Sequence, residues 1–430
     1  MTHRPKRCVI LGAGTGGTLA ANRLRKTHEE EELVIDIVDQ NNQHVYQPGL
    51  LFVPFGLAEP EEIVRRRDRQ LHRGITYHQS AIEAVDLSND VVTLENGTTL
   101  GYDVLLVATG SVLQPEETEG LSGPGWLDTV FTFYDVEGAT ALAEKLETFD
   151  SGRLVINVVD MPVKCPVAPL EFAFLADWYF TERGVRDNIS ITYVTPLDGA
   201  FTKPTASMAL TSLLEEKGIE LRTEFNTAEV DGEAGLLIGY DGTEIPFDLA
   251  VVIPLHGGAE YVNNSPGLGD ELGFVPTNNA TLQSEVAPNV FVIGDAADIP
   301  ASKAGSVTHF EGEVLIENLE AFLDGRDLEA EFDGHANCFI ETGFSKALLI
   351  DFNYETEPLR GHYPGPVGLP LLKESRLNHI GKLMFQSFYW HGLLPGRDLP
   401  GLSADMPTFG KRLPTEDEAS LTTTTGDTQT

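Results

Sequence analysis

The cysteines of this chain stand in contexts with different chemical possibilities. Cys165 lies in the segment KCPVAPLE, directly after Lys164 and before an apolar run that predicts the start of a helix near Pro169. A neighbouring cation and a helix N-terminus both stabilise the thiolate, which is the reactive form of cysteine. Cys8 stands inside an apolar strand pattern and is expected to be a buried, inert thiol. Cys338 is so distant in the sequence that only the fold could bring it to Cys165.

A glycine-rich turn near the N-terminus is the second feature with chemical potential. Residues 12–17 read GAGTGG, between an apolar strand pattern and a helical pattern. Gly12, Gly14 and Gly17 fit the G-x-G-x-x-G fingerprint, whose glycines allow a tight turn, close approach of a pyrophosphate and close packing of helix on strand. The helix N-terminus offers free N–H groups to phosphates. The next strand pattern ends at Asp39, whose carboxylate can bind ribose hydroxyls, so the segment predicts a dinucleotide site.

Two later strand patterns indicate which dinucleotide is bound. One ends at Thr109–Gly110 and the other at Gly294–Asp295. Together with the glycine turn, they resemble the two-dinucleotide-binding-domain flavoproteins, in which both segments return to the FAD domain and the aspartate holds the ribityl chain. The resemblance implies FAD as the cofactor. The cofactor-binding residues that we expect are Gly12, Ala13, Gly14, Thr15, Gly16, Gly17, Asp39, Gln40, Ala81, Thr109, Gly110, Gly294, Asp295, Lys303 and Lys382.

The second nucleotide-type fold lacks the turn that a nicotinamide cofactor would need. Its first strand pattern, Ser151–Asp160, should run into another glycine fingerprint in a chain that uses NADH or NADPH. Instead, no glycine occurs between Asp160 and Phe180, and three prolines stand there. Proline donates no N–H to a phosphate, and without glycine the backbone cannot approach one closely. The segment therefore predicts that this domain binds no nicotinamide dinucleotide.

With a flavin expected nearby, the pair Cys165 and Cys338 suggests thiol–disulfide chemistry. A thiolate attacks, a mixed disulfide forms and electrons leave in pairs, while the flavin carries out the electron transfer. The chain has no Cys-x-x-Cys or histidine-rich spacing, so no metal site is predicted.

Five segments make the resemblance more specific: GAGTGG (12–17), CPVAPLE (165–171), GDAADIPASKAG (294–305), NCFIETG (337–343) and GKLMFQSFYW (381–390). Over roughly residues 6–395 the chain resembles the sulfide:quinone oxidoreductases, membrane-associated members of the flavin disulfide reductase superfamily. The resemblance implies sulfide and quinone as substrates and Cys165 and Cys338 as the redox pair, with Cys338 nearer the flavin. It further implies Glu171 as a carboxylate beside the isoalloxazine, Lys382 as a lysine near flavin and quinone, and Phe339 and Phe385 as the aromatic residues around the quinone ring.

Some alternatives stay open. Glu171 could interact only with a helix dipole, and the two phenylalanines could be ordinary core. A third cysteine found in many family members has no counterpart here, and the family's histidine helpers are not evident; His309 and His362 are candidates by chemistry alone. The rival functions are a type II NADH:quinone oxidoreductase and a non-catalytic FAD-binding module.

The elements that must position these residues indicate an α/β fold with two Rossmann-like domains and a C-terminal amphipathic region. We expect a discontinuous FAD domain (1–110 and 270–335), a second Rossmann-like domain without the glycine fingerprint (111–269), a C-terminal region for quinone and membrane interface (336–400) and a disordered tail (401–430). Within Leu369–Arg397, the apolar spacing predicts an amphipathic helix, and Tyr389 and Trp390 suit a membrane interface. The alternative is a helix that caps the FAD domain.

Charge and composition narrow the class of protein. Acidic residues outnumber basic ones 66 to 29, for a formal net charge of −37, which disfavours nucleic acid as a partner. The carboxylates are spread along the chain, as expected for a protein that works in concentrated salt, where screening is short-ranged, and a halophilic archaeon is the predicted source. No segment has the roughly 18–20 consecutive apolar residues of a spanning helix, and the N-terminus shows no signal peptide. We expect a peripheral protein at the cytoplasmic face of the membrane, with homo-oligomerisation possible.

Overall fold

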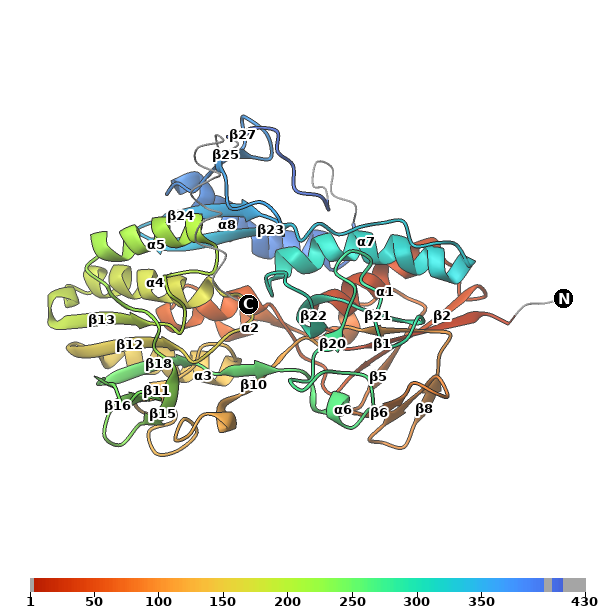
Figure 1. The fold of residues 1–430 in the computed structure, drawn as a ribbon, viewed down its shortest axis with the longest axis horizontal. Helices are drawn as coiled ribbons and strands as arrows, with labels where there is room; N and C mark the ends of the chain where they lie inside the picture. Colours follow the sequence, from red (N-terminus) through yellow and green to blue (C-terminus); the bar gives the residue numbers. More distant parts are fainter. Residues whose placement is uncertain (1–3, 398–403, 413–430) are drawn as a thin grey trace.

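The computed structural model describes residues 4–397 and 404–412, which form two α/β halves and a C-terminal layer (Figure 1). Each half is built on a five-stranded sheet, and the C-terminal strands and the helix α8 lie over the junction between the halves. The C-terminal strand β23 contacts the helix α4 of the second half and the helix α7 of the first. The predicted α/β class with two Rossmann-like folds is confirmed.

The first half is a parallel sheet in the order β21-β9-β1-β2-β5. Its strands come from two distant parts of the chain, because the last of them is added from near residue 290. Two helices, α1 (Thr15–Thr27) and α7 (Gly305–Asp324), pack against each other on one face. The strands are β1 (Lys6–Leu11), β2 (Leu33–Asp39), β5 (Ile75–Gln79), β9 (Val104–Val107) and β21 (Val290–Val292).

The second half repeats this architecture with the order β11-β18-β12-β13-β14, all parallel. Its central strands are apolar almost throughout, as expected for strands that are covered on both faces. The helices are α3 (Val136–Thr148), α4 (Ala168–Glu182) and α5 (Pro204–Glu216). The strands are β11 (Val130–Phe131), β12 (Gly152–Val158), β13 (Ile189–Val194), β14 (Glu220–Arg222) and β18 (Leu249–Ile253).

Short antiparallel elements extend and connect the halves. The two halves are joined by a two-stranded ribbon of β10 (Val112–Gln114) and β19 (Leu255–Gly257), so the chain crosses between them twice. Each half also carries a three-stranded antiparallel sheet. These sheets are β6 (Ile82–Asp86), β7 (Val91–Leu94) and β8 (Thr99–Gly101) in the first half, and β15 (Thr227–Asp231), β16 (Leu236–Gly239) and β17 (Glu244–Pro246) in the second. The remaining short elements are β3 (His44–Val45), β4 (Val64–Arg65), β20 (Val275–Pro276), β22 (Ala297–Asp298), α2 (Pro60–Ile63) and α6 (Glu260–Asn263).

The C-terminal layer consists of a hairpin, a small sheet and a helix. The hairpin pairs β23 (Ala336–Gly343) with β24 (Lys346–Phe352). The helix α8 (Arg376–Phe388) lies on this hairpin and continues into a turn of π-helix, η7 (Tyr389–Leu393). The small sheet contains β25 (Arg360–Tyr363), β26 (Leu369–Leu371) and β27 (Lys411–Arg412).

Two sequence predictions for this layer are wrong in part. A disordered tail was predicted from residue 401, but residues 404–412 are ordered and β27 pairs with β25, because the buried Lys411 ammonium forms an ion pair with the buried Asp351 carboxylate. The rest of that predicted tail, 401–403 and 413–430, lies outside the described residues. Tyr389 and Trp390, predicted to lie at a membrane interface, are only 2% and 3% exposed, since they pack under the first half beside Tyr46 and His44.

Candidate active site

The glycine turn has the geometry that a bound pyrophosphate requires. Gly12 has φ +93°, and a Cβ there would lie 2.4 Å from the Ala108 carbonyl oxygen, while a Cβ on Gly17 would collide with the Gly12 carbonyl oxygen. A Cβ on Gly14 would meet nothing, since that residue faces open space. Gly14 is also the N-cap of α1 and provides no side chain to bind the first N–H groups of the helix. These donors are therefore available to an anion.

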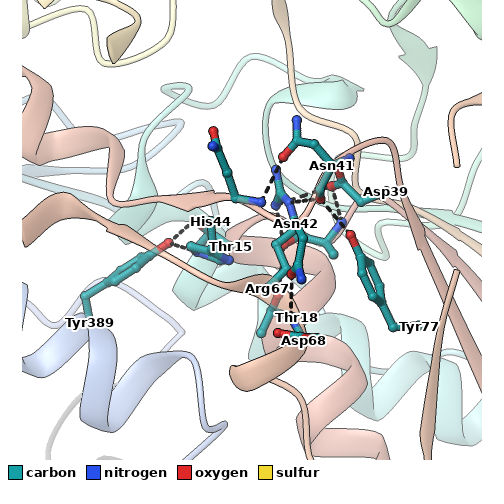
Figure 2. A network of polar contacts seen from close by, with 12 residues as sticks. Thr15, Thr18, Asp39, Asn41, Asn42, His44, Arg67, Asp68, Tyr77 and Tyr389 are labelled. Atoms are coloured by element: carbon teal, nitrogen blue, oxygen red, sulfur yellow. Dashed lines mark hydrogen bonds and ion pairs between the residues drawn. The ribbon is translucent and has the colours of Figure 1, made fainter. Parts of the chain in front are cut away.

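The predicted ribose-binding carboxylate is part of a polar network at the end of β2. Asp39 accepts a hydrogen bond from the Ala13 N–H (2.8 Å) and lies 3.3 Å from the guanidinium of Arg67. Arg67 also donates to the carbonyl oxygens of Ala13 (2.6 Å) and Asn41 (3.0 Å). Figure 2 shows this arginine beside Asp39, together with Tyr77, whose hydroxyl donates to the Asn41 carbonyl oxygen (2.6 Å). Arg67 thus fixes the loop that carries Asp39 relative to the glycine turn.

A second part of this network joins the C-terminal region to the glycine turn. The Tyr389 hydroxyl lies 2.7 Å from Thr15 Oγ1 and 2.7 Å from His44 Nε2, as Figure 2 shows. Burial lowers the pKa of His44 to about 3, and Arg67 adds to this effect, so the imidazole is neutral and one of its nitrogens can accept a hydrogen bond from the hydroxyl. From the C-terminal layer, Tyr389 therefore positions Thr15, the first residue of α1.

A large cavity extends from the glycine turn to Cys165, with an empty volume of about 1320 Å³ including its open mouth. Most of the predicted cofactor and catalytic residues line it: Gly12, Gly14, Thr15, Gly16, Asp39, Thr109, Gly110, Cys165, Glu171, Gly294, Asp295, Lys303, Lys382 and Phe385. The predicted residues outside its lining are Ala13, Gly17, Gln40, Ala81, Cys338 and Phe339. Ala13 and Gly17 support the turn through the contacts described above. Gln40 and Ala81 flank Asp39 and the end of β5 without reaching the cavity.

Cys165 is presented by a loop that is held from three sides. Its backbone is left-handed, with φ 48°, a conformation that costs energy for a residue with a side chain. Its N–H donates to the Lys303 carbonyl oxygen (2.5 Å), and its own carbonyl accepts from the Ala168 N–H (2.9 Å) and the Tyr134 hydroxyl (3.1 Å). The bond to Ala168, the first residue of α4, places the thiol just before that helix. The surrounding contacts compensate for the strain and aim Cys165 at the cavity.

Glu171 and Lys382 form a buried ion pair on the cavity wall. The Lys382 ammonium contacts Glu171 Oε1 and also donates to the Phe339 carbonyl oxygen (3.1 Å). Glu171 Oε1 accepts a further hydrogen bond from the Glu341 N–H (2.6 Å). Burial raises the pKa of Glu171, whereas Lys382 and the hydrogen bonds lower it. This pair ties α4 and α8 to β23, the strand that carries Cys338.

The thiols lie within electrostatic range of one another and of this ion pair. Burial raises the pKa of Cys338 to about 12; Glu171 acts in the same direction and Lys382 opposes both. Burial also raises the pKa of Cys165, and the charges of Glu171 and Cys338 increase the effect while Lys382 opposes it. All three cysteines are free thiols in the structure, and Cys8 is fully buried in β1 as expected.

One expectation about the thiols therefore needs correction. A thiolate-favouring setting was expected for Cys165, but burial outweighs the neighbouring positive charge, and the cation that lowers its pKa is Lys382, which the sequence places 217 positions later. Lys164 is instead near the Tyr134 ring, with its own pKa lowered by burial. Of the two thiols, Cys165 lines the cavity and Cys338 does not; the expected position of Cys338 nearer the flavin stays a prediction.

The two predicted quinone-binding phenylalanines come from different elements, Phe385 from α8 and Phe339 from β23. Phe385 lines the cavity and its ring is 5.9 Å from that of Phe388. Phe339 is half-buried beneath the helix, where a Cβ on Gly381 would come within 3.0 Å of its ring. Gly381 thus allows the helix backbone to rest directly on Phe339. The histidines considered as helpers do not line the cavity: His309 is buried on α7 and His362 is exposed on β25.

Several residues of the site were not identified from the sequence. Arg67 lies in a run of arginines that reads as a solvated surface, and Tyr389 reads as part of an amphipathic helix. Tyr134, whose hydroxyl holds the Cys165 loop, precedes a helix without any motif. Arg67 could have been found as a cation that follows the glycine turn and Asp39 in a dinucleotide-binding fold. Neither tyrosine stands in a recognisable local motif.

The residues present fit FAD. A glycine turn open toward the cavity, uncapped N–H groups of α1 and a carboxylate at the end of β2 together match a dinucleotide, and the cavity continues from there to a pair of thiols. In the second half, the loop between β12 and α4 carries Cys165 and two prolines, and a third proline lies in the first turn of α4, where a nicotinamide cofactor would need glycine.

The N-terminal part of the chain matches a known family of oxidoreductases. The pyridine nucleotide-disulphide oxidoreductase family matches residues 6–159. The chain is an FAD-dependent oxidoreductase with two dinucleotide-binding folds.

Within this class, the chain is similar to sulfide:quinone oxidoreductases. The mitochondrial enzyme of Dictyostelium discoideum is 27% identical, covering 90% of this chain and 86% of the relative. The mitochondrial enzyme of Mus musculus is 26% identical with the same coverage. The crystal structure of sulfide:quinone oxidoreductase from Aquifex aeolicus superposes with a TM-score of 0.78 at 20% identity and covers 91% of this chain and 92% of that one. The predicted resemblance to the sulfide:quinone oxidoreductase family is confirmed.

Proposed function

We propose that this chain oxidises sulfide to sulfane sulfur and reduces a quinone, using Cys165, Cys338 and FAD. The observation that carries the proposal is the placement of a strained cysteine, a second thiol within electrostatic range and a buried ion pair at the far end of the dinucleotide cavity. A nucleotide-binding role alone does not require this arrangement, and the relatives named above are sulfide:quinone oxidoreductases.

The cysteines would carry out the sulfur chemistry. In the oxidised enzyme, hydrosulfide attacks a Cys165–Cys338 disulfide: a new S–S bond forms between the sulfide sulfur and one cysteine, the old S–S bond breaks, and the other cysteine leaves as a thiolate. Lys382 lowers the pKa of both thiols, so it favours this thiolate whichever cysteine is released. Bound FAD would supply two-electron transfer from the sulfur site to the quinone.

Glu171 would hold a proton near the reacting sulfurs. Its side chain is 1% exposed and lies beside both thiols and the Lys382 ammonium. Because burial raises the pKa of Glu171 while Lys382 lowers it, the carboxyl can change its protonation state as charge appears and disappears on the sulfurs.

The quinone would lie near Phe385 and Phe339 at α8. The exposed face of this helix is apolar, with Leu377, Ile380, Leu383 and Met384 each at least 50% exposed. Such a surface suits the hydrocarbon boundary of a membrane, from which a hydrophobic quinone would enter. No helix within residues 4–397 and 404–412 is long and apolar enough to cross a bilayer. The proposal is peripheral attachment through α8, at the cytoplasmic face.

Sulfide and NADH titrations separate this function from its rivals. The FAD-loaded protein is titrated anaerobically in high salt, with sulfide in one cell and NADH in another, and flavin absorbance is followed. We expect bleaching by sulfide alone, reversed by a quinone analogue, and no bleaching by sulfide in C165S or C338S. Bleaching by NADH alone would support a type II NADH:quinone oxidoreductase. Sulfide responses that are the same in both serine variants as in the wild type would support a non-catalytic flavin module.

A further inference from the structure

A histidine–carboxylate pair connects the surface of α8 with the buried ion pair of the site. His379 Nδ1 lies 2.9 Å from Glu341 Oε2 and 3.0 Å from Oε1. The histidine side chain is 22% exposed and the carboxylate 2%, so one partner reaches solvent while the other does not. A histidine that meets both solvent and a buried carboxylate can carry protons between them.

Glu341 is joined to the catalytic ion pair through the backbone of β23. Its N–H donates to Glu171 Oε1 (2.6 Å), and two residues earlier the Phe339 carbonyl oxygen accepts from the Lys382 ammonium (3.1 Å). Residues two apart on a strand share one face, so the side chains of Phe339 and Glu341 point together toward α8. The Glu341 carboxylate is also within electrostatic range of Lys382.

We propose that His379 and Glu341 deliver protons from solvent to the quinone that is reduced beside Phe339 and Lys382. This inference rests on the proposed function. Reduction of a quinone to a quinol takes up two electrons, which come from sulfide, and two protons, which must reach the quinone beside α8. A proton passes from His379 Nδ1 to the Glu341 carboxylate and on toward the quinone oxygen by way of the Lys382 ammonium, and His379 is reprotonated from solvent through Nε2.

The other charged groups near His379 and Glu341 do not compete with proton transfer from the histidine to the carboxylate. On the site side, Glu341 interacts with Lys382, and its N–H donates to Glu171 Oε1. On β24, Lys346 forms an ion pair with Glu374 (3.6 Å). The second titratable residue of that strand, Asp351, is paired with His335 and Lys411. Burial raises the pKa of Glu341, and His379 is the chief group that lowers it.

The decisive experiment isolates the quinone half of the reaction. The FAD-loaded enzyme is reduced anaerobically with dithionite and reoxidised with a water-soluble quinone analogue in a stopped-flow instrument. The variant H379N keeps a donor close to the position of Nδ1 but cannot carry a proton. We expect its reoxidation rate to fall about 100-fold, the lower end of the usual contribution of a proton-transferring side chain. We expect added imidazole to restore much of the rate, and the acidic limb of the pH profile to change.

The matched control is a second histidine–carboxylate pair far from the site. His78 Nε2 lies 2.7 Å from Asp36 Oδ1, with side-chain exposures of 23% and 6%. We expect H78N to reoxidise at the wild-type rate. The proposal is overturned if H379N also matches the wild type, if H78N is slowed equally, or if imidazole restores nothing.

A second variant and a spectroscopic measurement guard against a folding artefact. E341Q keeps the hydrogen bond to His379 and should slow reoxidation as H379N does. The carboxylic C=O band of Glu341, assigned in the infrared spectrum by its loss in E341Q, should persist to higher pH in H379N, since loss of His379 raises the pKa of Glu341. An unchanged band titration would contradict the coupling. Sulfide is absent from these measurements, so wild-type enzyme that reoxidises normally but is not reduced by sulfide would refute the proposed function without refuting the proton path.

Discussion

Lys382 provides the most direct test of how the site is held together. In K382M the ammonium is lost, and the Glu171 carboxyl, 1% exposed, keeps no cationic partner. The carboxyl ionises above its ordinary pKa of 4.5 in the unfolded chain, whereas in the fold burial raises its pKa and the loss of Lys382 removes the chief group that lowers it, so K382M favours the protonated form. Holding that proton costs about 1.4 kcal/mol per pH unit, or about 3 kcal/mol at pH 7. This agrees with the roughly 3–5 kcal/mol usually lost when one partner of a buried pair is removed.

The expected change in melting temperature follows from the length of the chain. At about 2.1 cal/mol/K per residue, 430 residues unfold with an entropy of about 0.9 kcal/mol/K, so the loss lowers Tm by about 3–5 °C. The sign with pH is fixed, because a carboxyl whose pKa is raised in the folded state loses stability as the pH rises from 4.5 through the folded-state pKa. The deficit of K382M should therefore widen between about pH 5 and pH 7.

Scanning calorimetry of the FAD-loaded protein provides the measurement, with flavin content checked by absorbance. The double variant E171Q/K382M removes the unpaired carboxyl and should recover part of the lost Tm, because glutamine can still accept from the Glu341 N–H. The control is K346M, which breaks a surface pair with Glu374 and should cost at most about 1 kcal/mol. The reasoning is refuted if K382M melts with the wild type at pH 7, or if the double variant is no more stable than the single one.

Two further predictions concern the cofactor cavity and the charged surface. In Y389F, Thr15 and His44 lose the hydroxyl that lies between them. The free energy of unfolding, measured with urea, should fall by about 1–3 kcal/mol, and FAD should dissociate more readily. An unchanged free energy of unfolding and an unchanged FAD dissociation rate would show that this contact is dispensable. The net charge of −37 predicts that Tm rises as NaCl is raised from about 0.1 M to several molar. Most of the rise should occur below roughly 1 M, because the Debye length shortens fastest there. A flat or falling Tm would contradict the proposed adaptation to salt.

The parts of the site that could be predicted from the sequence are those whose chemistry depends on adjacent residues. The turn at Gly12–Gly17 could be identified because its backbone conformation allows few residue types. For the same reason, the glycine-free segment that carries Cys165 excludes a second nucleotide-binding turn. Asp39 could be placed because a strand of ordinary length separates it from α1.

The parts that could not be predicted depend on contacts between distant segments. Lys382 reaches Cys165 and Glu171 only because α8 lies on β23, and the pairing of His379 with Glu341 has the same origin. Lys411 lies in a segment whose composition predicts a disordered tail, but its ammonium is buried against the Asp351 carboxylate. In the sequence, nothing distinguishes Asp351 from the other acidic residues, of which there are 66. Tyr389 and Trp390 are residue types that are common at membrane interfaces, but they are buried because the first half covers them, and the sequence does not show this contact.

The strand β27 has a consequence for how the polypeptide is made. Residues 411 and 412 close the small sheet, and Lys411 neutralises the buried Asp351 carboxylate beside the hairpin that carries Cys338. The ribosome must therefore release almost the whole chain before this layer can close, whereas the first half can assemble once β21 and α7 have emerged. A message that stops before codon 411, and so lacks the last 20 residues, would yield a protein able to build its dinucleotide cavity, with the buried Asp351 carboxylate left to His335 and Asn337 and without the Lys411 ammonium.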